Sequence, residues 1–196
     1  MIAKIKLNRI KENSIVENLE LKRLTMVIQI FNQLFAESEN TLLVSGAKEP
    51  FYKASTKDSK AKIHSREDYL SSALHEMAHW TIAGEKRRQI DDFGYWYEEE
   101  GRTLEQQLQF EQVEIKPQAI EWLLSLACNQ PFYFSADNLS QETEASEYFK
   151  QAVYRQAVDF LKYGLPYRGK ILFEEIVKTF RDGVALSAKE LEIENA

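Results

Sequence analysis

The chain has 196 residues, 44% hydrophobic and 29% charged, a balance that suits a single globular domain with a sizeable core. Its formal net charge of −6 argues against a nucleic-acid-binding surface, and no apolar run approaches the roughly 20 residues of a membrane-spanning helix. The single cysteine, Cys128, excludes an internal disulfide and a cysteine zinc cluster. These features predict a cytoplasmic protein with a buried thiol, and they leave its oligomeric state open.

The first third of the chain predicts one helix and a small sheet. Residues 1–22 are mixed and charged, with weak periodicity, and form an N-terminal extension of uncertain order. Apolar residues at helical spacing predict a core helix over Leu24–Phe35. Three short runs bounded by turn residues then predict the strands of an antiparallel or mixed sheet: Thr41–Ser45, Pro50–Ala54 and Ala61–His64.

An amphipathic helix is predicted next, between Ser65 and Gly84. Ser65 and Asp68 fit a capping box, and Gly84 stands where a left-handed residue would end the helix. Its apolar stripe consists of Leu70, Leu74 and Met77. One face of this helix should therefore pack against the core.

Two histidines project from the other face. His75 and His79 are four residues apart, so a helix places them one turn apart on one side, about opposite the apolar stripe. Neutral imidazoles bind zinc, iron, copper or nickel, so the pair predicts a metal site without choosing the metal. The competing interpretation is two exposed or hydrogen-bonded histidines. We favour the metal site because two of the chain's three histidines fall in this spacing.

An aromatic segment, Asp92–Tyr97, and an acidic tip, Glu98–Gly101, separate this helix from the next one. We expect the aromatic segment to pack in the core or in a hairpin, with the wall of a substrate site as the alternative. The following helix opens at Thr103, with Gln106 as its capping partner. Its predicted apolar stripe consists of Phe110, Val113, Pro117, Ile120 and Leu124.

A histidine pair needs a further protein ligand, usually a carboxylate from another element. Glu111 and Glu114 are the nearest downstream candidates on a helix. Glu114 lies about 90° and Glu111 about 150° from the centre of the apolar stripe, so Glu114 is the more inward of the two. Gln118 and Glu121 share its face and could support a ligand or contact a substrate. Two more helices are predicted over Thr143–Tyr163 and Lys170–Arg181, and we expect them to be part of the structural scaffold and to take no part in the chemistry.

One block of the sequence is far more specific than the histidine motif. It is rich in Trp, Tyr, Gly and Pro and comprises Asp92–Tyr97, Gly101–Arg102, Gln109–Glu111, Val113–Ala119 and Trp122. Flanking matches include His75–Glu76, His79–Trp80, Ile82–Gly84, Pro131–Phe132, Ser135, Asp137–Leu139, Gly164–Pro166 and Arg168. In these residues the chain resembles the bacterial elongation factor P hydroxylase family, over roughly Val27 to Phe180.

The resemblance implies an iron-dependent hydroxylase that acts on elongation factor P after a lysine of that factor has received a β-lysyl group. It implies Fe(II) held by His75, His79 and Glu114, with Glu111 as the reserve ligand and O₂ as cosubstrate. A set of two histidines and one carboxylate suits non-haem iron, because it leaves positions open. Glu76 is the candidate catalytic residue, as a proton-handling group in a hydroxylase or the general base in a peptidase.

Two alternatives stay open at this point. A zinc metallopeptidase would use the same four side chains, and a non-catalytic module that binds a translation factor would hold a structural metal. The fold class expected in each case is α+β with a zincin-like arrangement, mostly helical, with the small sheet packed near the metal-binding helix. Residues 23–186 would form the single catalytic metal-binding domain, followed by a tail over 187–196.

Overall fold

The computed structural model describes residues 2–92, 103–135 and 145–193, with side chains from residue 18 onward apart from that of Leu104. Within these ranges five α-helices accompany one three-stranded sheet, so the fold is α+β, as predicted. Nowhere in the described chain is a helix long and apolar enough to cross a membrane. The zincin-like arrangement stays a prediction.

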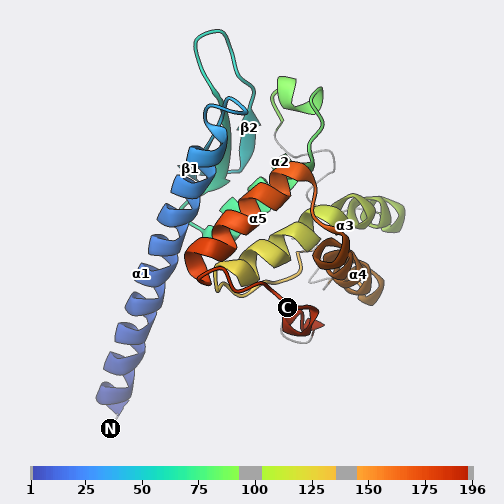
Figure 1. Ribbon diagram of the computed structural model, residues 1–196. Coiled ribbons are helices and arrows are strands. Elements are labelled where there is room, and N and C mark those ends of the chain that lie inside the picture. Colours follow the sequence, from blue (N-terminus) through green and yellow to red (C-terminus); the bar gives the residue numbers. More distant parts are fainter. Residues whose placement is uncertain (1, 93–102, 136–144, 194–196) are drawn as a thin grey trace.

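Helix α1 (Ile2–Phe35) runs along one side of the molecule, and its N-terminal half extends past the other helices (Figure 1). The helix predicted over Leu24–Phe35 is confirmed, and the structure begins it at Ile2. Its buried side chains include Leu24, Val27, Phe31 and Phe35. The ring centroids of Phe31 and Phe35 each lie 4.9 Å from that of Trp80, so α1 packs against the helix that carries the two histidines.

The sheet has the strand order β1-β3-β2 and is mixed. Strand β1 (Thr41–Ala47) pairs with β3 (Ala61–Arg66) in parallel, whereas β2 (Phe51–Lys53) pairs with β3 antiparallel. All three predicted strands are therefore confirmed. The buried residues of β3 alternate with exposed or half-buried ones, and this strand contacts helix α2. The sheet thus supports the helix of the candidate site.

Helix α2 (Leu70–Ile82) carries the predicted stripe, since Leu70, Leu74 and Met77 are fully buried. The predicted capping box is wrong, because Ser65 is a buried residue of β3 and the N-cap position falls on Tyr69, whose side chain makes no capping bond. The carboxylate of Glu20 on α1 accepts a 3.3 Å hydrogen bond from the Leu70 N–H instead. Tertiary structure has supplied the cap that local sequence was expected to provide.

Helix α2 also ends differently from the prediction. Its C-cap is Ala83 in an extended conformation, and Gly84 does not adopt a positive φ. The side chain of Arg168 donates to the carbonyl oxygens of Trp80 (3.2 Å) and Ala83 (2.6 Å). The Trp80 carbonyl also accepts a 3.2 Å hydrogen bond from the Ala83 N–H. The bonds from Arg168 thus reinforce the end of the helix, where carbonyl groups lack the partners of the helix interior, without a left-handed glycine. A single-turn helix, η1 (Arg87–Gln89), follows.

Helix α3 (Leu104–Ala127) begins at the predicted capping box of Thr103 and Gln106 and continues past Pro117. It contacts α2, α4 and α5. The predicted stripe is wrong at Val113, which is 52% exposed, whereas Glu111, expected on the outer face, is buried. A stripe calculation assumes one buried side, and this helix is covered on several. Cys128 is buried at its end, as predicted, and burial raises the pKa of the thiol to about 12.

The two scaffold helices are α4 (Glu147–Tyr163) and α5 (Tyr167–Phe180), followed by the short helix η2 (Ala188–Glu190). Gly164 ends α4 with a φ of +99°, a conformation that glycine adopts readily. The helical spacing of α4 predicts that Tyr148, Phe149, Val153 and Phe160 pack against the core. The last three are buried, whereas Tyr148 is 65% exposed. The predictions for residues 93–101 and for Thr143 lie outside the described residues.

Candidate metal centre

The two histidines of α2 face each other across one helical turn. The rings of His75 and His79 meet edge to face, with centroids 4.6 Å apart, and their Nε2 atoms are separated by 3.1 Å. Their side chains are 23% and 36% exposed. The histidine face therefore remains accessible while the opposite face of α2 is buried, as the periodicity predicted.

Helix α3 brings one carboxylate to this pair. Oε1 of Glu114 lies 3.2 Å from Nε2 of His79, and its Oε2 lies 4.0 Å from Nε2 of His75. The three ligand atoms all lie within 4.8 Å of one another. In the described part of the chain, these are the His, Cys, Asp and Glu side chains that gather closely enough to hold a metal ion.

The donor set fits a metal ion on two observations. Oε2 of Glu114 is buried, and among the described residues it has no hydrogen-bond partner. Two nitrogens that bind one ion at about 2.1 Å and a right angle lie about 3 Å apart, close to the observed separation of the two Nε2 atoms. A buried, unpartnered carboxylate oxygen is costly unless a cation shares the site, so the geometry favours one.

The charges of the site also favour a bound cation. Burial alone would raise the pKa of Glu114, but the charges of His79 and His75 outweigh it and lower that pKa to about 2. Burial would lower the pKa of His75, yet the neighbouring carboxylates, Glu121 first, hold it well above 6.5. Glu114 is therefore ionised at neutral pH, and without a metal the positive charge that balances it comes from protonated imidazole.

Two other polar residues of α3 also contact the site or its surroundings. Oε2 of Glu121 lies 2.8 Å from Nδ1 of His75, the ring nitrogen that faces away from Glu114. The amide of Gln118 pairs with the backbone of Ser135, donating to its carbonyl oxygen (2.8 Å) and accepting from its N–H (3.2 Å). Glu121 therefore contacts a histidine, whereas Gln118 holds the chain after α3 and also helps to lower the pKa of Glu114 through a side-chain hydrogen bond.

Glu111, the reserve ligand, lies elsewhere. It is 4% exposed, and its Oε2 accepts a 2.8 Å hydrogen bond from the hydroxyl of Ser146, the N-cap residue of α4. The structure brings Glu114, and not Glu111, to the histidines. This agrees with the angular estimate, although Glu111 is far more buried than that estimate implied.

Glu76 follows His75 on α2 and is half-buried. Burial is the largest cause that raises its pKa, and the charges of the two histidines oppose this shift. Its carboxyl group is thus more easily protonated than an exposed one. Its assignment as the catalytic residue stays a prediction.

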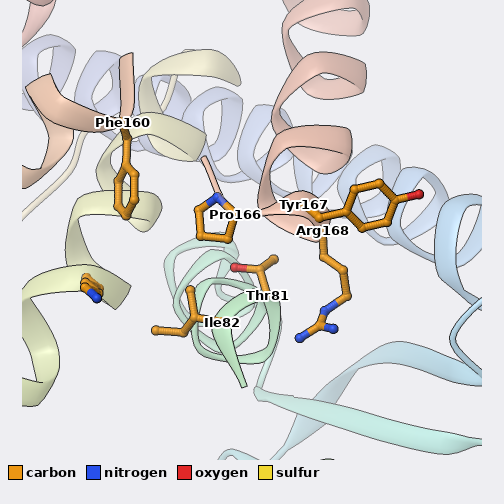
Figure 2. Close-up of a pocket in the computed structure, with 7 residues that line it drawn as sticks. Thr81, Ile82, Phe160, Pro166, Tyr167 and Arg168 are labelled. Atoms are coloured by element: carbon orange, nitrogen blue, oxygen red, sulfur yellow. The ribbon is translucent and has the colours of Figure 1, made fainter. Parts of the chain in front are cut away.

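A surface pocket of about 470 Å³ opens at the C-terminal end of α2 (Figure 2). Its lining residues come from α2, α3, α4 and the start of α5: Thr81, Ile82, Lys116, Phe160, Pro166, Tyr167 and Arg168. Ile82 lies three residues after His79 and hence on the same side of α2. The pocket therefore begins about one helical turn beyond the histidine pair. Sequence reasoning missed it, because it is formed by four elements that are distant in the chain.

Two comparisons with known proteins identify relatives of this chain. The family model for elongation factor P hydroxylase matches residues 30–191. A protein of Haemophilus influenzae described as elongation factor P lysine hydroxylase is 46% identical over 156 residues, which cover 79% of this chain and 88% of that protein. The matched region contains the sheet, the histidine helix and all of α3 to α5.

Proposed function

The chain belongs to the elongation factor P hydroxylase family, and on that premise we propose that it is an oxidoreductase that hydroxylates the β-lysylated lysine of elongation factor P. It would act in the cytoplasm, where translation factors work. The observation that carries the proposal is the group of His75, His79 and Glu114, whose ligand atoms converge at the interface of α2 and α3. No side chain alone can oxidise an unactivated C–H bond, so the reaction needs a reactive cofactor, and we assign its binding to this group.

The cofactor that suits these donors is Fe(II). Two imidazoles and one carboxylate on one side of the ion leave positions for O₂ and for the substrate. Bound iron would supply the insertion of one atom of O₂ into a C–H bond of the modified lysine, and the other oxygen atom would leave as water with two electrons and two protons from an external reductant.

The protein residues position and balance this chemistry. The Nε2 atoms of His75 and His79 already lie 3.1 Å apart, which limits the reorganisation needed for both to bind one ion. Glu114 contributes a negative charge, because its pKa of about 2 keeps it ionised. The buried stripe of α2, together with Glu20 and Arg168 at its ends, holds the histidine helix in place.

We assign proton handling to Glu76. Its carboxyl group sits on the same helix as both histidines, and burial raises its pKa, so it takes up a proton more readily than an exposed carboxyl group does. Glu76→Gln should keep the metal and lower the rate of hydroxylation. Loss of the metal in this variant would contradict the assignment.

The experiment that tests the function uses anaerobically purified, Fe(II)-loaded protein, β-lysylated elongation factor P, O₂ and an added electron donor, with mass spectrometry of the product. We expect a gain of one oxygen atom that disappears in Glu114→Ala and persists in the matched control Glu111→Ala. No gain, with zinc copurifying in place of iron, would contradict the hydroxylase and favour a metallopeptidase or a structural metal.

A further inference from the structure

We propose that Glu121 is a positioning residue for the metal: by accepting the Nδ1–H of His75, it directs the Nε2 of that ring into the site. The inference rests on the proposed metal site of His75, His79 and Glu114. Glu121 lies two turns after Glu114 on α3 and is 7% exposed. Its Oε2 is 2.8 Å from Nδ1 of His75, a distance expected for a charge-assisted hydrogen bond.

The chemistry of imidazole explains why this contact matters. A neutral histidine carries its proton on one ring nitrogen and binds metal through the other, and the hydrogen bond of the protonated nitrogen decides which is which. A carboxylate can only accept, so the Glu121 contact keeps the proton on Nδ1 of His75. Nε2 then retains its lone pair, and Nε2 is the atom that faces His79 and Glu114. The carboxylate also increases the basicity of the ligand.

The position of Glu121 argues against a role as a fourth ligand. It approaches His75 from the Nδ1 side, and the group of convergent ligand atoms does not include it. His79 differs from His75 in this respect, because within the described chain no hydrogen bond reaches its Nδ1. The site therefore has one histidine whose ring is fixed by a carboxylate and one that is not fixed in this way.

Glu111 provides a matched control. It is a buried glutamate of the same helix, and its partner is the hydroxyl of Ser146 rather than a histidine. If Glu121 merely stabilised the fold through an ion pair, substitutions at Glu121 and at Glu111 would both lower the melting temperature, and neither would change the affinity for metal. A positioning role predicts that only the Glu121 variants lose affinity.

The first experiment measures the Kd of Co(II), as a spectroscopic substitute for Fe(II), and the thermal unfolding of the metal-free protein. Removal of a residue that supports a metal ligand typically weakens binding by about 10–100-fold, and we expect Glu121→Ala to fall in this range. Glu121→Gln should reduce the affinity for Co(II) less than Glu121→Ala does, because an amide oxygen can still accept the Nδ1–H. Glu111→Gln should bind Co(II) as the unsubstituted protein does. Equal affinity in all four proteins would overturn the inference.

A second measurement does not depend on affinity. Long-range ¹H–¹⁵N spectra of the Zn(II)-loaded protein should show His75 protonated at Nδ1 and metal-bound at Nε2, and Glu121→Ala should lose the protected Nδ1–H signal. Metal bound through Nδ1 would overturn the inference. If the unsubstituted protein bound metal as described but did not hydroxylate elongation factor P, the proposed function would fail and the inference would stand. If it bound no metal, both would fail.

Discussion

Helix α3 carries two buried glutamates, three positions apart, in two different environments. Glu111 accepts a hydrogen bond from Ser146, and this bond also ties α3 to the start of α4. Glu114 has one oxygen near His79 and another that lacks a hydrogen-bond partner among the described residues. Burial alone would mark both as unusual. The difference shows that the satisfaction of each oxygen, and not its burial, separates a structural carboxylate from a candidate ligand.

The largest expected effect contrasts Glu114→Ala with Glu111→Ala. Loss of Glu114 removes the one charged ligand. Metal affinity should therefore fall by more than about 10–100-fold, the loss that is typical of a residue that only supports a ligand. Hydroxylation should stop. Loss of Glu111 should leave bound metal unchanged and lower the free energy of unfolding. Metal analysis and denaturant titration check both. Metal loss on changing Glu111 alone would reverse the assignment of the two residues.

The pH dependence of metal binding gives the next effect. The pKa of His75 in the metal-free protein is well above 6.5, so a metal must displace a proton from this ring at neutral pH. Affinity should therefore rise by about tenfold per pH unit until the pH exceeds that pKa, and then level off. Calorimetric titrations in buffers of different ionisation enthalpy would count the released protons. A metal affinity that does not change with pH over this range would contradict the charge balance described for the site.

Acid stability tests Glu114 in the absence of metal. Its pKa is about 2 in the folded protein, against an ordinary value of 4.5. A carboxyl group with a lowered pKa stabilises the fold above the ordinary value, and this stabilisation is lost as the pH falls through 4.5 toward about 2. Glu114→Gln should flatten the fall in unfolding free energy across this window. An unchanged slope would show that the histidines do not hold Glu114 ionised.

The smallest expected effect concerns the partner of Glu111. Ser146→Ala removes an N-cap and the hydrogen bond to a buried carboxylate, which together should cost about 1–3 kcal/mol of unfolding free energy. The Kd for metal should not change, because Ser146 does not contact the histidine group. A weakened metal site in this variant would mean that the two environments on α3 are coupled.

Much of the site follows from local sequence patterns, because helical spacing, turn residues and capping motifs each depend on neighbouring residues alone. The histidine pair on the outer face of α2, the strands that support it and the capping box of Thr103 all have this origin. The choice of Glu114 over Glu111 also followed from the helical angle, with support from the family resemblance.

The rest depends on contacts between distant parts of the chain. The cap of α2 comes from Glu20, fifty residues earlier in the chain, and its C-terminal carbonyls are satisfied by Arg168. The burial of Glu111 and the exposure of Val113 reflect the packing of α3 on several sides, which a single amphipathic stripe cannot represent. The hydrogen bond between Glu121 and His75 joins two helices, and only the tertiary structure shows it.

The central claim is that His75, His79 and Glu114 hold one iron ion between α2 and α3. An anomalous-difference map at the iron edge, from crystals grown with Fe(II) without oxygen, tests it most directly. The account predicts a single strong peak about 2.0–2.2 Å from both Nε2 atoms and from a carboxylate oxygen of Glu114. A peak elsewhere, or one bound by Glu111 or by Nδ1 of His75, would contradict it.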